Sequence, residues 1–230
     1  MYVLCHLLAG LLAGIFLSWW GKDRRLAIAC VCGSVLPDVI DKPLGLLLAG
    51  SMGFGRIFSH TLLFVTLVLC AGVVVWMDSR NRAYGDGILI AAALGIFLHH
   101  VLDTLWDEPR TWFWPLYGPF PPPKSTPLIP YILGDISQPA EWLFGIAFLF
   151  LWAGLFRRVE VGRRFSPALF AVLALAAFFA FFCAVGGSPC AVTGWDNRLD
   201  NIYVGLVLLG GAIAILWQKR GTLPGEGERP

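Results

Sequence analysis

The sequence predicts an all-α protein, a polytopic transmembrane helix bundle of about seven spans. Hydrophobic residues make up 57% of the 230-residue chain and charged residues only 14%, whereas a soluble domain carries about 25% charged residues. The mean hydropathy is correspondingly high, at +0.72. Several apolar stretches come close to the roughly 20 residues that a helix needs to cross a bilayer. We expect them to form a single bundle over residues 1–220.

The apolar stretches occupy most of the chain, at about residues 2–20, 26–46, 57–77, 87–106, 141–157, 167–186 and 200–217. The first lacks a basic leading region and a small-residue cleavage site, so we interpret it as a retained helix and not a signal peptide. Pro37 and Pro43 bracket two carboxylates and a lysine in the second stretch. Since proline removes a backbone donor, we expect the second span to be broken at Pro37–Pro43.

Two further segments differ from the apolar stretches in composition. Residues 107–139 are polar and aromatic and contain three consecutive prolines. We expect them to form an interfacial cap, stiffened by those prolines. The Gly- and Pro-rich residues 221–230 are expected to be a disordered tail.

The distribution of basic residues predicts the orientation in the membrane. Twelve of the 17 Lys and Arg residues follow the first, third, fifth and seventh stretches, and basic loops favour the cytoplasmic side. We therefore expect a multi-pass protein of the plasma membrane with its N-terminus outside and its C-terminus in the cytoplasm. The net charge of +2 and the lack of a basic tract give no indication of nucleic-acid binding.

Ionisable residues within the apolar stretches share a common depth. Counted from the predicted cytoplasmic end of each span, seven of them lie roughly 12–17 residues along: His6, Asp38, Asp41, His60, His100, Asp103 and Glu141. At about 1.5 Å per residue this places them roughly 18–26 Å from the cytoplasmic surface. Unrelated polar residues would scatter in depth, so we expect one shared site in the outer half of the bilayer.

The polar residues at the end of the fourth stretch indicate what such a site binds. His100 and Asp103 are three residues apart and His99 and Asp103 four apart, so either pair shares one face of a helix. Imidazole and carboxylate groups are ligands for divalent metals, and ionisable groups at this depth are costly unless they have a function. The alternative is a polar pair that simply joins two helices.

Further candidates surround these residues. Arg56 is expected either to hold an anionic head group by a bidentate contact or to reach towards water. Trp112 and Trp114 fit an interfacial aromatic belt, or a cap that holds acyl chains over the site. Cys183 and Cys190 flank a short turn and are able to form a disulfide if that loop is extracytoplasmic.

These residues follow a fixed order along the chain: His6, Leu36-Pro37-Asp38 with Asp41 and Lys42, Ser59-His60-Thr61, His100-x-x-Asp103, and Trp114-Pro115-Leu116. Over roughly the first 120 residues this set resembles the YdjM-like family of predicted membrane-bound metal-dependent hydrolases, which has a distant likeness to zinc-dependent phospholipases C. The resemblance implies a hydrolase whose His and Asp positions ligate metal. Many members carry Asp-x-Asp after the proline, whereas two residues separate Asp38 from Asp41 here. This leaves open whether both carboxylates bind metal or Asp41 pairs with Lys42.

Together, the pattern and the resemblance predict an integral membrane hydrolase that acts on a lipid ester or phosphoester at the outer leaflet. One or two divalent ions, most simply zinc, would be held by five residues: His6, Asp38, His60, His100 and Asp103. Asp41 would be a bridging ligand or general base, and His99 a supporting partner or ligand. Substrate would contact five others: Lys42, Arg56, Glu141, Trp112 and Trp114. The alternatives are a transporter of protons or metal ions that uses the same cluster, and a noncatalytic lipid-binding protein with a structural metal.

Overall fold

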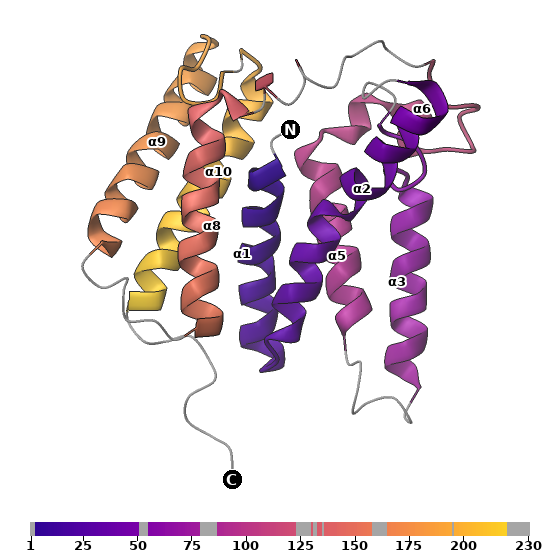
Figure 1. Cartoon of the computed structure of the whole chain (residues 1–230), viewed down its shortest axis with the longest axis horizontal. Helices are drawn as coiled ribbons and strands as arrows, with labels where there is room; N and C mark the ends of the chain where they lie inside the picture. Colours follow the sequence, from indigo (N-terminus) through magenta and orange to yellow (C-terminus); the bar gives the residue numbers. More distant parts are fainter. Residues whose placement is uncertain are drawn as a thin grey trace.

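The structure is a computed structural model that describes residues 3–50, 55–78, 87–122, 130, 133–134, 136–157, 165–194 and 196–219. All the regular elements within these ranges are helices (Figure 1). The long ones are α1 (Val3–Gly21), α2 (Arg25–Ala49), α3 (Leu62–Met77), α5 (Ile88–Leu102), α8 (Pro139–Arg157), α9 (Ser166–Gly186) and α10 (Arg198–Lys219). Two short ones, η1 (Leu105–Asp107) and α6 (Pro109–Trp112), follow α5. The predicted all-α class is confirmed.

The seven long helices match the seven predicted apolar stretches in order. α1, α9 and α10 are long and apolar enough to cross a membrane, and α3, α5 and most of α8 are shorter apolar helices. α2 has 25 residues but carries Asp38, Asp41 and Lys42. Two boundaries differ from the prediction by four or more residues, because α3 starts at Leu62 and α5 ends at Leu102. His60 and Asp103 therefore lie beside helix ends and not within helices.

Helix α1 lies between two groups of helices (Figure 1). On one side it packs against α8 and α10 around a core that includes Leu8, Phe144 and Leu208, and α10 in turn packs against α9. On the other side it packs against α2 and α5, and α3 lies beyond α5. In Figure 1, α1 begins at the upper end of the bundle and α10 ends at the lower end.

Glycines allow α1, α2 and α5 to approach one another closely. A Cβ atom added to Gly33 of α2 would clash with the backbone of Ala92, and one added to Gly95 of α5 would clash with the carbonyl of Cys30. Gly10 of α1 similarly faces the side chain of Ser34. Small residues at such crossings are a common feature of packed membrane helices. They bring the backbone of α2 within reach of side chains on α5.

The prediction that the second span is broken at Pro37–Pro43 is wrong, because α2 continues as a helix through both prolines. In Figure 1 it bends part-way along, and its second half leans away from α1. Backbone carbonyls near the first proline gain partners from other elements: His99 Nδ1 bonds to Ser34 O at 2.8 Å, and Ser59 Oγ to Pro37 O at 3.0 Å. Membrane helices tolerate proline where neighbouring side chains bond to the backbone groups that it frees.

The remaining predictions on the peripheral segments have mixed outcomes. Cys183 and Cys190 are free, buried thiols in this structure and not a disulfide. Residues 107–122 of the predicted cap form short helices and turns that pack aromatic side chains together. Residues 123–129, 131–132 and 135 of the cap, the tail 221–230 and most of the predicted cytoplasmic basic residues lie outside the described ranges.

Candidate metal centre

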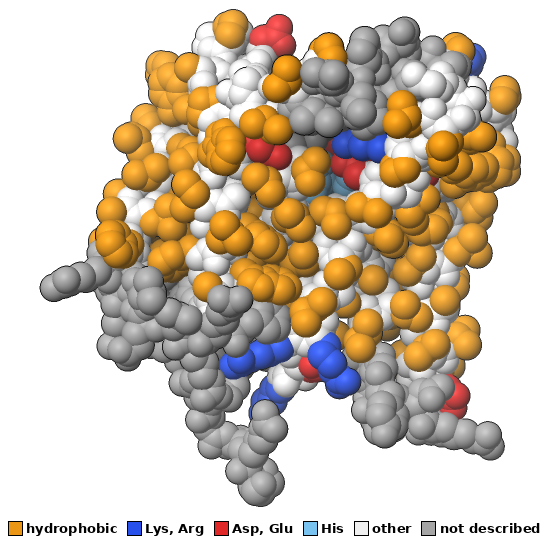
Figure 2. All heavy atoms as spheres, viewed as in Figure 1, with side chains coloured by type: hydrophobic (Ala, Val, Ile, Leu, Met, Phe, Trp, Pro, Cys, Tyr) orange, Lys and Arg blue, Asp and Glu red, His pale blue; other side chains and the backbone are white. Residues whose placement is uncertain are grey.

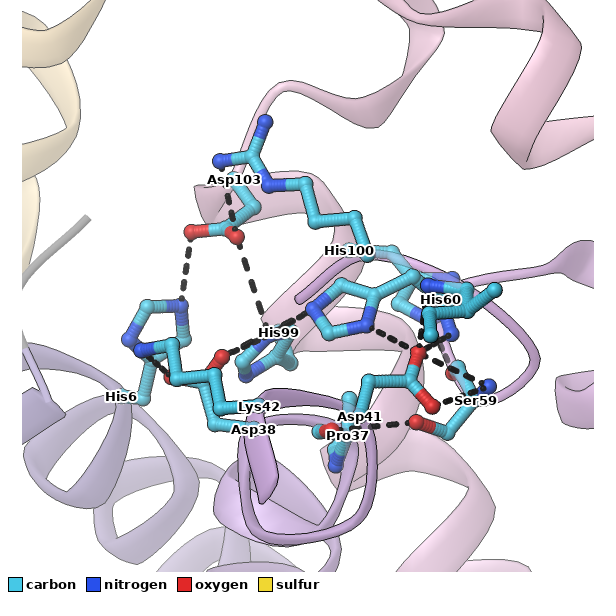
Figure 3. A network of polar contacts seen from close by, with 12 residues as sticks. His6, Pro37, Asp38, Asp41, Lys42, Ser59, His60, His99, His100 and Asp103 are labelled. Carbon is cyan, nitrogen blue, oxygen red and sulfur yellow. Dashed lines mark hydrogen bonds and ion pairs between the residues drawn. The ribbon is translucent and has the colours of Figure 1, made fainter. Parts of the chain in front are cut away.

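Four elements converge at one end of the bundle to form a cluster of histidines and carboxylates (Figure 3). The cluster draws His6 from the first turns of α1, Asp38 and Asp41 from α2, His60 from the turn before α3, and His99 and Asp103 from the end of α5. The histidines are all at most 1% exposed. The structure therefore brings together residues that are up to 97 positions apart in the sequence.

His99 lies at the centre of the cluster. Its Nδ1 is 2.8 Å from the carbonyl oxygen of Ser34. A carbonyl oxygen only accepts hydrogen bonds, so Nδ1 carries the proton and Nε2 of the neutral ring presents a lone pair. That Nε2 lies 3.2 Å from Nε2 of His60.

His60 is held by Asp41. The fully buried carboxylate of Asp41 accepts hydrogen bonds from the backbone nitrogens of Ile57, Ser59 and His60. It also contacts His60 Nδ1 at 2.8 Å, so this nitrogen donates and Nε2 is again the lone-pair atom. A carboxylate behind an imidazole is the usual support of a metal-binding histidine, because it fixes the tautomer and the ring orientation.

With both rings neutral, the two Nε2 atoms point their lone pairs at each other, which is repulsive unless a proton or a metal ion lies between them. Two ligands on a tetrahedral zinc ion at 2.0–2.1 Å are separated by about 3.3 Å, close to the observed 3.2 Å. Oxygen Oδ1 of Asp38 lies 3.7 Å from His60 Nε2 and 3.8 Å from His99 Nε2. The donor set and its spacing therefore fit a divalent ion.

Two overlapping groups of three have the spacing of metal ligands among the described residues. One is Asp38, His60 and His99, and the other is His6, His99 and Asp103. Both include His99, which is expected from the sequence to be a supporting partner or ligand. In the second group, His6 Nε2 lies 3.3 Å from Asp103 Oδ1.

Both basic residues beside the cluster are ion-paired. Lys42 Nζ lies 2.7 Å from Asp38 Oδ2. Arg56 lies 3.0 Å from Asp103 Oδ2 and 2.9 Å from Glu108 Oε1. Burial lowers the pKa of Arg56, but the carboxylates of Asp103 and Glu108 outweigh burial and raise it, so the guanidinium stays charged. Because about a third of its side chain is exposed, Arg56 closes the cluster on its solvent-facing side.

Three predicted site residues have contacts that differ from their expected roles. His100 is predicted as a ligand, but its Nε2 lies 3.0 Å from Ser59 O, and it belongs to neither of the two groups. Asp41 is predicted as a bridging ligand or general base, and its contacts are instead with the segment 57–60. Glu141 accepts a hydrogen bond from the backbone nitrogen of Leu4, which supports the first turn of α1.

The two tryptophans of the cap pack in aromatic clusters. Trp114 stacks on Phe120 with ring centroids 5.0 Å apart and meets Phe58 edge-on at 5.6 Å. Phe58 directly precedes the segment that holds Ser59 and His60, so this cluster joins the cap to the site. Trp112 contacts Trp106 and Phe113, so its ring contacts are with other aromatic side chains.

Ser34, Ser59 and Glu108 contribute to the centre, although the sequence alone assigns no role to any of them. Ser34 acts through its carbonyl oxygen and has no side-chain signature, whereas Ser59 acts through its backbone and hydroxyl and stands in the sequence only as part of its motif. Glu108 is next to Asp107 in a segment rich in charged residues, and only its pairing with Arg56 distinguishes it.

The space-filling view shows how the cluster meets the surface. Hydrophobic side chains cover most of the visible face, while basic and acidic side chains gather in a hollow near the upper end, where a histidine is visible (Figure 2). Another group of basic side chains lies at the lower end. The centre is thus buried but close to an opening.

Comparison with known proteins agrees with the membrane character of the chain. No match is found among curated proteins or among solved structures. The family model described as YdjM inner membrane protein matches residues 1–185, which include every residue of the cluster. The chain belongs to the YdjM inner membrane protein family.

Proposed function

We propose that this protein is an integral membrane hydrolase that uses a divalent metal ion, most simply zinc, to cleave a lipid ester or phosphoester. The observation that carries the proposal is the pair of buried imidazoles, His60 and His99, whose Nε2 atoms face each other at 3.2 Å while both Nδ1 atoms are bonded elsewhere. A divalent ion bound there would lower the pKa of a coordinated water to about 7 and polarise a phosphoryl or acyl oxygen.

The protein's own groups would hold and orient the reacting partners. Asp41 and the Ser34 carbonyl fix the two imidazoles before any ligand arrives, so little ordering is required on binding. Arg56 and Lys42 lie at the edge of the cluster, and each forms ion pairs with carboxylates. An anionic substrate would compete for these cations, and a bidentate contact to Arg56 suits a phosphate.

Apolar surfaces beside the site support a lipid substrate. Beyond Asp38, the buried residues of α2 are Asp41 and Gly45, whereas Val39, Leu47 and Leu48 are 64–82% exposed. Leu116 and Tyr117 of the cap are also largely exposed, at 85% and 62%. A molecule with a polar ester group and long apolar chains would match this combination of a polar centre and apolar flanks.

We also propose that the site faces the outside of the cell. Lys22 and Arg25 lie at the junction of α1 and α2, at the opposite end of these helices from the cluster. Basic residues at that end favour a cytoplasmic location for it. A transporter is a weaker candidate, because residues 7–21, 26–37, 62–77 and 88–98 contain no Asp, Glu, His, Lys or Arg. A pathway through the membrane normally has polar groups on both sides of its site.

The test is hydrolysis by the purified protein in lipid nanodiscs of defined composition. Release of a head group or a fatty acid would be measured with the protein as purified, after chelation, and after return of zinc. We expect turnover that chelation abolishes and zinc restores, and that His60→Ala eliminates. Asp23→Asn, a carboxylate substitution at the other end of α1 and α2, serves as the control. Metal-dependent uptake of ions into proteoliposomes without hydrolysis would overturn the proposal in favour of transport.

A further inference from the structure

The two overlapping groups of candidate ligands differ in how well their geometry fits a bound divalent ion. This difference determines how many ions the centre is able to hold. We infer that the site binds one divalent ion through Asp38, His60 and His99, and that His6 lies outside its coordination shell. This inference rests on the proposed metal dependence but not on the nature of the reaction. It departs from the ligand set expected from the sequence, which includes His6, His100 and Asp103.

The first argument is the single lone pair of His99. Both groups require its Nε2, because Nδ1 is bonded to the carbonyl oxygen of Ser34. One imidazole nitrogen has one lone pair in the ring plane and serves one ion at a time. Two ions that both use His99 are therefore excluded, and the ion must take one group or the other.

The second argument is the relative placement of the rings. Two imidazoles that bind one tetrahedral ion at 2.0–2.1 Å have ring centres about 5 Å apart. The rings of His60 and His99 are 5.0 Å apart with an interplanar angle of 71°. The rings of His6 and His99 are 4.1 Å apart in a tilted arrangement at 32°, which is too close for two ligands of one tetrahedral ion.

The third argument is the state of the two carboxylates. Asp38 pairs with Lys42 through Oδ2 and turns Oδ1 towards the Nε2 atoms of His60 and His99. Asp103 has His6 at Oδ1 and Arg56 at Oδ2, so each of its oxygens already faces a partner.

His6 has a different place in the site. It begins a chain of polar contacts that continues through Asp103 and Arg56 to Glu108 of the cap, with steps of 3.3, 3.0 and 2.9 Å. This chain connects α1, α5 and the segment before α3 with the short helices after α5. We assign to His6 the role of a positioning residue that fixes Asp103 and Arg56 beside the ion.

Metal content and spectroscopy test this inference without any activity assay. The full-length protein in nanodiscs would be loaded with zinc or with cobalt and compared with His6→Ala, His6→Gln, His60→Ala and His99→Ala. We expect one ion per chain in the wild type and in both His6 variants, with unchanged cobalt absorption bands. His60→Ala and His99→Ala should bind the ion at least tenfold more weakly. Two ions per chain, or equal losses in the His6 and His60 variants, would overturn the inference.

A measurement on the wild type alone covers the case in which the variants fail to fold. X-ray absorption of the zinc-loaded protein counts the imidazoles bound to the ion through their multiple scattering. Two imidazoles are the expected result, and three would contradict it. A protein that binds one ion through two imidazoles but hydrolyses no lipid would support this inference and reject the proposed hydrolase.

Discussion

Asp41 binds His60 twice, accepting hydrogen bonds from its backbone nitrogen and from its ring. The same carboxylate receives the backbone nitrogens of Ile57 and Ser59. One side chain of α2 thus fixes both the path of the segment before α3 and the direction of the imidazole that it carries.

Replacement of Asp41 is therefore expected to affect both folding and metal binding. In Asp41→Asn the amide cannot accept all of these donors, and we expect a clear loss of thermal stability because a buried hydrogen-bond network is broken. We also expect a 10–100-fold loss of zinc affinity, the usual effect of removing a group behind a ligating histidine. Competition with a chelating dye measures the affinity. Unchanged affinity in Asp41→Asn, with Asp23→Asn as the matched control, would contradict this role.

Chelation should lower the stability of the wild type. A ligand present at about 100 times its Kd stabilises the folded state by about 2.7 kcal/mol. We expect zinc to raise the Tm of the protein in nanodiscs and a chelator to reverse the rise. His60→Ala should show neither change, since it lacks one of the facing Nε2 atoms. A Tm that responds to zinc equally in the wild type and His60→Ala would indicate binding elsewhere.

The close crossing of α2 and α5 should not tolerate a methyl group. In Gly95→Ala the new Cβ would lie against the carbonyl of Cys30, and overpacking of this kind typically costs about 1–3 kcal/mol. Since Ser34 and His99 face each other across the same crossing, we also expect weaker zinc binding. Gly134→Ala is the control, because nothing lies within 4 Å of a Cβ there. Equal unfolding temperatures of the two variants would refute the prediction.

Thr61, the residue that caps the N-terminus of helix α3, provides a prediction that concerns the stability of the fold alone. Thr61 Oγ1 accepts the backbone nitrogen of Phe64 at 3.1 Å, which satisfies a free donor of the first turn. Thr61→Ala is expected to destabilise the protein by about 0.5–2 kcal/mol. Thr66→Ala, on the exposed surface of the same helix, should have a much smaller effect. Chemical denaturation in a mild detergent measures the difference between the two variants.

The sequence predicts the fold well because apolar length is a strong signal. Seven stretches become seven long helices, and the histidines and aspartates that share a depth come together near His99, whereas Glu141 contacts the start of α1. The finer assignment of roles depends on the direction of each side chain, which the sequence does not contain. His99 and His100 are adjacent and chemically identical, and only the rotation of α5 against α2 turns His99 towards Ser34 and His100 towards Ser59.

The course of α2 is unpredictable from the sequence for a similar reason. Pro37 and Pro43 normally end a helix, and the sequence does not reveal that His99 and Ser59 reach the carbonyls near the first of them. The role of Asp41 is hidden in the same way. Its partners are backbone nitrogens in a turn 16–19 residues later, and a backbone nitrogen has no signature in the sequence.

Asp38 lies in the middle of α2, and 11 further residues of the helix extend beyond it, a rise of about 16 Å. His60, which belongs to the segment 55–61, and His99 are meanwhile completely buried. An ion must shed most of its hydration shell to reach these ligands, and we expect it to leave when that segment, held to α2 by Asp41, separates from it. We therefore expect slow exchange: radioactive zinc, once loaded, should leave the folded protein at the rate at which the segment opens, whatever the concentration of chelator outside.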